Sequence, residues 1–148
     1  MNKAIKIISI FVGVTFLIVA SLIVLFIIHI SKPPYERKEF IDFLNSKEEL
    51  RLQLISDIKF GKTRLDENNY VVIENKYNGV AKNNIVYFEK CDEKECIVSF
   101  LYEPGFPDED QYLFYSSEGE ELIEKNLDES LYNYIKEVKE HWYFVQYN

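Results

Sequence analysis

Residues 7–30 form an unbroken apolar run of 24 residues, and no other feature constrains the fold of this chain so strongly. A helix rises about 1.5 Å per residue, so such a run reaches roughly 36 Å, more than the about 30 Å of a bilayer's hydrocarbon core. The run has no charged side chain and no polar face, whereas a helix buried in a soluble protein shows one. We therefore expect a transmembrane helix at 7–30.

A cleaved signal peptide is the main alternative, because Lys3 and Lys6 resemble the positively charged start of one. The peptidase site would fall near Ala20, yet residues 22–28 continue fully apolar and offer no polar flank. We expect an uncleaved signal-anchor in a single-pass membrane protein. Its predicted parts are a short tail (1–6), the transmembrane helix (7–30), a juxtamembrane segment (31–39) and a soluble acidic α+β domain (40–148).

Composition limits the structure and the partners of the chain beyond the apolar run. After residue 30 the chain has 118 residues, enough for one core, and 20 aromatic residues, which exclude intrinsic disorder. The same part carries 15 basic and 25 acidic residues, a net charge of −10. Binding to nucleic acid requires clustered Lys and Arg, so we expect no nucleic-acid partner.

The start of the domain is predicted to be helical. Pro34 suits the first turn of a helix, and Phe40, Phe43 and Leu44 share one helical face. A second helix is expected after a capping box formed by Ser46 and Glu49. Three residues would face the core from this helix: Leu50, Leu54 and Ile58. Residues 50–60 also alternate between apolar and polar, so a strand is the alternative.

The rest of the chain is rich in β-forming residues. Strands are predicted at 70–74, 84–91, 96–103 and 111–116. The connections are short, which favours an antiparallel meander. Asn126 and Glu129 can cap a further helix, whose apolar face would carry Leu127, Leu131, Tyr134, Ile135 and Val138. Residues 142–147 are predicted to form a closing strand. The predicted fold class is α+β, with the meander flanked by helices.

Cys91 and Cys96 would stand opposite each other if residues 92–95 form a four-residue loop. Opposite strand residues have a Cα separation that suits a disulfide. The same register predicts three cross-strand pairs: Tyr87–Phe100, Ile85–Tyr102 and Val86–Leu101. Two reduced cysteines are the first alternative. A zinc site needs two more ligands, with His141 the one candidate, and a redox motif needs Cys-x-x-Cys.

Catalytic motifs are lacking in this sequence. His141 is the one histidine after the apolar run, and the glycines are isolated, which excludes a P-loop. The acidic stretches 108–110 and 118–121 are typical of solvated loops, and they lack the ligand spacing of a calcium-binding EF-hand. We expect no enzyme, no cofactor and no metal.

The loop 104–110 is the predicted partner-binding tip. Its two prolines and its glycine stiffen the loop, which lowers the ordering cost of binding. Phe106 is its one large apolar residue and is surrounded by Asp108, Glu109 and Asp110, the pattern of an aromatic anchor with a charged rim. The alternative is that Phe106 folds back to cover the sheet.

Topology and function can be predicted from these features. Basic residues near the run slightly favour a domain in the cytoplasm. Two arguments favour the opposite orientation: long domains translocate regardless of their charge, and a disulfide requires an oxidising compartment. We expect the domain outside the cytoplasm at the cell membrane, where it binds a protein partner or organises an envelope assembly. The alternatives are an immunity protein that captures a basic effector, or a hydrolase using clustered carboxylates.

Overall fold

The computed structural model describes residues 3–92, 94–103 and 110–147, in two compact units, 1–38 and 39–148. The first unit consists of a 29-residue helix, α1 (Lys3–Ser31), and a 3-10 turn, η1 (Pro34–Glu36). Pro34 opens this turn, as its fixed φ angle predicts. The turn is shorter than the helix we expected there, and α2 begins at Lys38.

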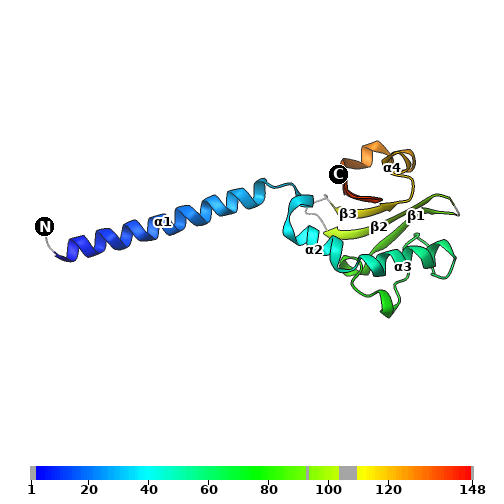
Figure 1. The fold of residues 1–148 in the computed structure, drawn as a ribbon, viewed down its shortest axis with the longest axis horizontal. Helices are drawn as coiled ribbons and strands as arrows, with labels where there is room; N and C mark the ends of the chain where they lie inside the picture. Colours follow the sequence, from blue (N-terminus) through cyan, green and yellow to red (C-terminus); the bar gives the residue numbers. More distant parts are fainter. Residues whose placement is uncertain (1–2, 93, 104–109, 148) are drawn as a thin grey trace. The chain divides into compact units, whose positions relative to one another are not determined.

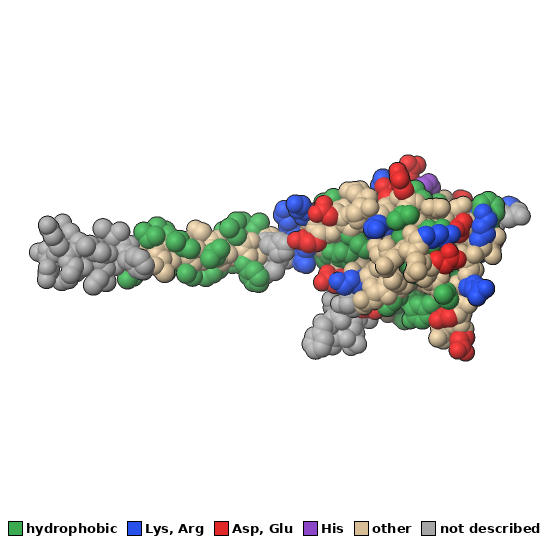
Figure 2. Space-filling model, turned by 90° about the horizontal axis from the view of Figure 1, so that it is seen from below, with side chains coloured by type: hydrophobic (Ala, Val, Ile, Leu, Met, Phe, Trp, Pro, Cys, Tyr) green, Lys and Arg blue, Asp and Glu red, His purple; other side chains and the backbone are tan. Residues whose placement is uncertain are grey.

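The predicted helix over 7–30 is present within α1. Its side chains are described from residue 12 to residue 28, where all but Ala20 are exposed, and apolar atoms cover most of this stretch in Figure 2. Among the described residues, no helix combines the length and the apolarity needed to cross a membrane, so the predicted transmembrane span is not found.

Two helices open the second unit, α2 (Lys38–Ser46) and α3 (Glu48–Lys59). They bury apolar residues at the predicted helical spacing: Phe40, Leu44, Leu54 and Ile58. The strand alternative for 50–60 is therefore wrong. The predicted capping box is also wrong, because Ser46 stays at the end of α2, where its hydroxyl donates to the carbonyl of Phe43 at 3.4 Å.

A five-stranded antiparallel sheet forms the centre of this unit. Its strands are β1 (Val86–Cys91), β2 (Cys96–Glu103), β3 (Gln111–Ser116), β4 (Tyr132–Lys139) and β5 (Trp142–Tyr147). The spatial order is β1-β2-β3-β5-β4, so the first three strands form the predicted meander and β4 lies at the edge. The α+β class is thereby confirmed, and β2, β3 and β5 have the predicted bounds.

The two faces of the sheet are covered differently. Figure 1 shows α2 and α3 on one side of the sheet and α4 (Glu120–Asn126) on the other. On the first face, Phe40 packs edge-on against Tyr102 and Phe144, with ring centroids 5.0 and 5.3 Å apart. On the second face, Leu122 and Ile123 of α4 pack into a core with residues of β2, β3 and β5. Three further 3-10 turns are η2 (Asn75–Tyr77), η3 (Lys82–Asn84) and η4 (Glu129–Leu131).

The register of the β1–β2 hairpin is correct at the cysteines and shifts by one residue beyond them. Cys91 pairs with Cys96 as predicted, but a bulge between Phe88 and Lys90 inserts Glu89 as an extra residue. The three predicted pairs are therefore wrong, and the observed ones are Val86–Phe100, Tyr87–Ser99 and Phe88–Val98. The bulge changes which residues share a face of the sheet.

Residues 70–74 do not form the predicted strand. The Asp66 side chain accepts hydrogen bonds from the backbone of Asn68 and Tyr70, both at 2.9 Å, which bends the chain just before this segment. Only two isolated bridges involve the segment, Leu65–Val71 and Tyr70–Tyr87. The segment consequently lies along the edge of β1 as irregular extended chain.

The helix predicted from residue 126 is wrong. A helix in this region, α4, ends at Asn126, and β4 occupies most of the predicted range. Bulges interrupt the alternation of β4, so its half-buried residues are Tyr132, Ile135 and Val138. A spacing of three imitates a helical face, which is why the sequence pattern misled us.

Candidate functional site

A pocket of about 390 Å³ opens on the sheet face that carries α4, at the end of the sheet near β1. α4 has only seven residues and leaves this part of the face uncovered. The lining residues are Asn68, Asn69, Tyr87, Phe88, Glu89, Ser99, Tyr112 and Tyr147. Three of the eight are tyrosines that come from three different strands, and we call this cavity the tyrosine pocket.

The tyrosine rings are held by contacts with one another. Tyr112 lies between the other two lining tyrosines, with ring centroids 6.4 Å from Tyr87 and 5.2 Å from Tyr147. Tyr70, from the segment beside β1, packs on Tyr87 with the two ring centroids 3.9 Å apart. The Tyr70 hydroxyl accepts a hydrogen bond from the Tyr87 hydroxyl. The pocket wall is therefore a continuous group of aromatic rings fixed on a rigid sheet.

Glu89 is the charged group in the pocket lining, and it lies at the β-bulge of β1. Its side chain remains open to solvent, while the surrounding groups remove part of the water around its carboxylate. This partial burial raises the pKa of Glu89, and a hydrogen bond from the buried Ser99 hydroxyl opposes the rise. Bulges often re-aim a side chain beside a functional site.

The three lining tyrosines stay neutral at physiological pH. Burial is the main cause that raises the pKa of Tyr87, Tyr112 and Tyr147. The negative charges of Glu89 and Asp110 add to the rise, Glu89 at Tyr87 and Tyr147, and Asp110 at Tyr87 and Tyr112. Electrostatically, the pocket is negative and its phenol groups keep their protons.

One of the predicted partner-binding residues lies beside the tyrosine pocket. The Asp110 carboxylate accepts a hydrogen bond from the Tyr112 hydroxyl at 3.3 Å, and its backbone carbonyl accepts one from the amide of Tyr147 at 2.9 Å. The other three predicted residues, Phe106, Asp108 and Glu109, lie outside the described residues.

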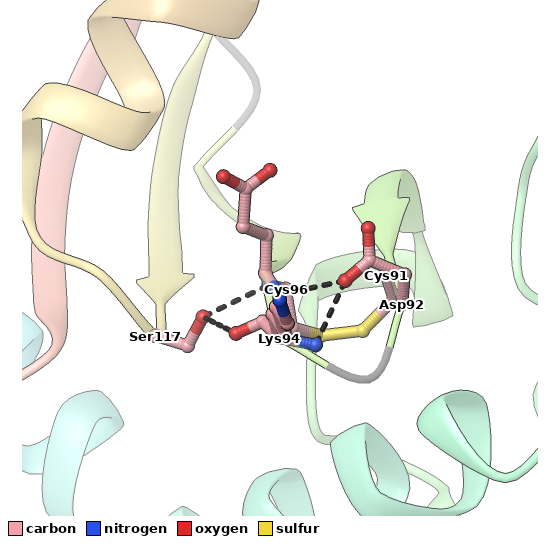
Figure 3. Close-up of a disulfide and its surroundings, with 6 residues drawn as sticks. Cys91, Asp92, Lys94, Cys96 and Ser117 are labelled. Carbon is pink, nitrogen blue, oxygen red and sulfur yellow. Dashed lines mark hydrogen bonds between the residues drawn. A yellow bond between two sulfur atoms is a disulfide. The ribbon is translucent and has the colours of Figure 1, made fainter.

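The predicted cysteine pair is present at disulfide-bonding distance, with Cα atoms 3.9 Å apart (Figure 3). Around it, the Asp92 carboxylate accepts hydrogen bonds from the backbone of Lys94 and Glu95, both at 2.8 Å. The Ser117 hydroxyl accepts from the amide of Cys96 at 2.9 Å. This arrangement ties the hairpin to the end of β3 and has a structural role.

The other candidate sites in the described chain offer fewer functional groups than the tyrosine pocket. A wider depression of about 620 Å³ lies between α2 and residues 78–84, with Tyr102 as the one tyrosine in its lining. No group of three or more His, Cys, Asp or Glu side chains that could hold a metal ion occurs among the described residues. His141 lies in the β4–β5 turn, where its ring contacts the Ser116 carbonyl at 3.1 Å.

Comparisons with protein-family models, with curated proteins and with solved structures found no match to this chain.

The sequence alone does not single out the residues of the tyrosine pocket. Tyr87 and Glu89 are two residues apart in a predicted strand, a spacing that places both on one face in a regular strand. A glutamate within an aromatic strand was a usable signal. Tyr112 and Tyr147 gave none, because their contact depends on the pairing of β3 with β5.

Proposed function

We propose that this chain is a single-pass membrane protein whose domain lies outside the cytoplasm and binds a protein partner through the tyrosine pocket. The observation that carries the proposal is the pocket itself, an uncovered part of the sheet lined by fixed tyrosine rings and one carboxylate. Tyrosine is enriched at protein interfaces, because it supplies a large contact area with a polar tip. We propose a binding role without catalysis.

The membrane part of the proposal rests on the sequence. The 24-residue run at 7–30 has no charged side chain and exceeds the length needed to cross the hydrocarbon core. The paired cysteines support a domain in an oxidising compartment. The net charge of −10 after residue 30 favours a basic partner, because opposite charges accelerate encounter.

Site-specific photo-crosslinking tests the partner proposal. Asn68, exposed at the pocket, is replaced by a benzophenone amino acid in the full chain, and exposed Gln53 on α3 is replaced in the matched control. We expect one discrete protein adduct from position 68 and none from position 53. Adding Tyr112→Ala should reduce the adduct from position 68, because that substitution removes the central ring of the pocket wall.

The adduct's identity separates the two forms of the proposal. A basic effector protein would favour an immunity role, and a resident envelope protein would favour an assembly role. The absence of an adduct, or equal adducts from positions 68 and 53, would contradict partner binding at the pocket.

A further inference from the structure

The Glu89 carboxylate has no cationic partner among the residues that the structure describes. The ion pairs of the described chain do not include it, and the adjacent Lys90 is paired with Glu95. Within the described part of the chain, the Ser99 hydroxyl donates a hydrogen bond to the Glu89 carboxylate. The side chain of Glu89 is exposed in the pocket, so its carboxylate can pair with a cation that enters.

The groups around Glu89 are those that recognise a cation. The faces of tyrosine rings attract ammonium and guanidinium groups, and a carboxylate makes short, charge-assisted hydrogen bonds with them. Asn68 and Asn69 add amide oxygens that accept hydrogen bonds from the same donors. The lining contains no Lys or Arg among the described residues that would repel such a ligand.

We propose that the tyrosine pocket accepts a single cationic side chain, the ammonium of a lysine or the guanidinium of an arginine, from the protein partner. The cation lies between the tyrosine rings and the Glu89 carboxylate. This inference rests on the function proposed above and names the chemistry that the pocket recognises. At about 390 Å³ the pocket is at the small end of ligand sites, which suits one side chain.

Amino-acid derivatives test this chemistry directly. The full chain is labelled with 3-fluorotyrosine in mild detergent and titrated with N-acetyl-lysine-methylamide, with the arginine analogue and with the neutral norleucine analogue. We expect fluorine resonances of the pocket tyrosines to shift with at least one cationic probe, with a dissociation constant in the roughly millimolar range. The norleucine probe should leave them unchanged. The stronger of the two cationic probes identifies the side chain.

Glu89→Gln is the decisive variant, because it keeps the shape and removes the charge. Binding of the cationic probe should weaken by about tenfold or more. Glu49→Gln on α3 makes the same charge change at an exposed position and should leave binding unaltered. Equal binding of the lysine and norleucine probes, no binding of either cationic probe, or unchanged binding to Glu89→Gln would each overturn the inference.

The two proposals fail in different ways. If the photo-adduct from position 68 forms equally well with Glu89→Gln, partner binding stands and cation recognition is wrong. If the cationic probes bind but position 68 yields no adduct, the pocket recognises a cation and the protein partner is wrong. The thermal midpoint of Glu89→Gln provides the folding control and should not fall, since the side chain is exposed and the substitution keeps its shape.

Discussion

Arg51 is the largest fully buried side chain of the domain, and among the described residues no carboxylate forms an ion pair with it. Its guanidinium donates to the carbonyl of Val80 at 2.8 Å and to that of Leu44 at 3.1 Å, and it lies 4.1 Å from the centroid of the Phe43 ring. Burial lowers the pKa of Arg51 to about 10, so the group remains charged at neutral pH. It joins α2, α3 and the chain at residue 80.

We expect Arg51→Ala to reduce the free energy of unfolding by about 3 kcal/mol or more, because it opens a cavity and leaves two carbonyls without donors. Arg51→Met keeps most of the volume and should cost less. Urea unfolding of the full chain in mild detergent, followed by the fluorescence of Trp142, measures both variants. Exposed Gln53→Ala on the same helix is the control, and an equal effect there would contradict the structural role.

Glu89 makes stability depend on pH in a direction opposite to that of most carboxylates. Burial raises its pKa above the usual 4.5, so the folded state binds the proton more readily than the unfolded state. Its contribution to stability is therefore greatest at acid pH and is lost as pH rises through the interval up to the raised pKa. We expect Glu89→Gln to have a higher thermal midpoint than the parent at pH 7, with the difference closing towards pH 3.5. A higher midpoint for the parent at pH 7 would contradict this.

At the scale of elements, the β1–β2 hairpin is held by its turn as well as by the cysteines. The turn has the Asp92 hydrogen bonds and an ion pair between Lys90 and Glu95. Closing so short a loop by a disulfide contributes about 2 kcal/mol in the chain-entropy model. We expect the domain to remain folded after reduction, with a lower thermal midpoint.

Mass spectrometry of the chain isolated with thiols blocked measures the state of this pair. The peptide should be two hydrogens lighter than its reduced form and should carry no alkyl group. Complete alkylation of both cysteines in native membranes would show that they are reduced. Reduced cysteines would also no longer support a location of the domain outside the cytoplasm.

The loop before Asp110 remains a prediction. If Phe106 is an anchor for the partner, Phe106→Ala should leave the thermal midpoint nearly unchanged and weaken partner capture by about 2 kcal/mol. If Phe106 belongs to the core, the same substitution should cost about 3–5 kcal/mol of stability. The yield of the adduct from position 68, compared with the thermal midpoint, distinguishes the two outcomes. A destabilised domain with unaltered capture by its folded fraction would contradict the anchor.

At the scale of the whole molecule, we predict that the domain lies outside the cytoplasm and is held at the membrane by the apolar run. The chain has a mass of 17.6 kDa for 148 residues, so the part after residue 30 is about 14 kDa. Protease added to intact spheroplasts should remove this part and leave the apolar run in the membrane fraction. Protection in intact spheroplasts, with degradation only after lysis, would place the domain inside the cytoplasm.

Local sequence by itself determined several parts of this protein. The helix over 7–30 and the bounds of β2, β3 and β5 were predictable, because each depends on the hydropathy pattern and propensity of its own residues. The pairing of Cys91 with Cys96 was predictable for a similar reason, since a short loop leaves few alternative registers. Helix periodicity likewise identified four of the buried residues of α2 and α3, namely Phe40, Leu44, Leu54 and Ile58, but it did not identify Arg51 or Ile55.

Only the tertiary structure decided the rest. β4 is a strand because it pairs with β5, and its bulges bring every third residue to the core, a spacing that local patterns cannot distinguish from a helix. The bulge at Glu89 likewise reverses the predicted faces of β1. The tyrosine pocket depends on the assembly of the sheet, since Tyr87, Tyr112 and Tyr147 meet only when β1, β3 and β5 are assembled. Contacts between residues far apart in the chain override local preference, and they created this site.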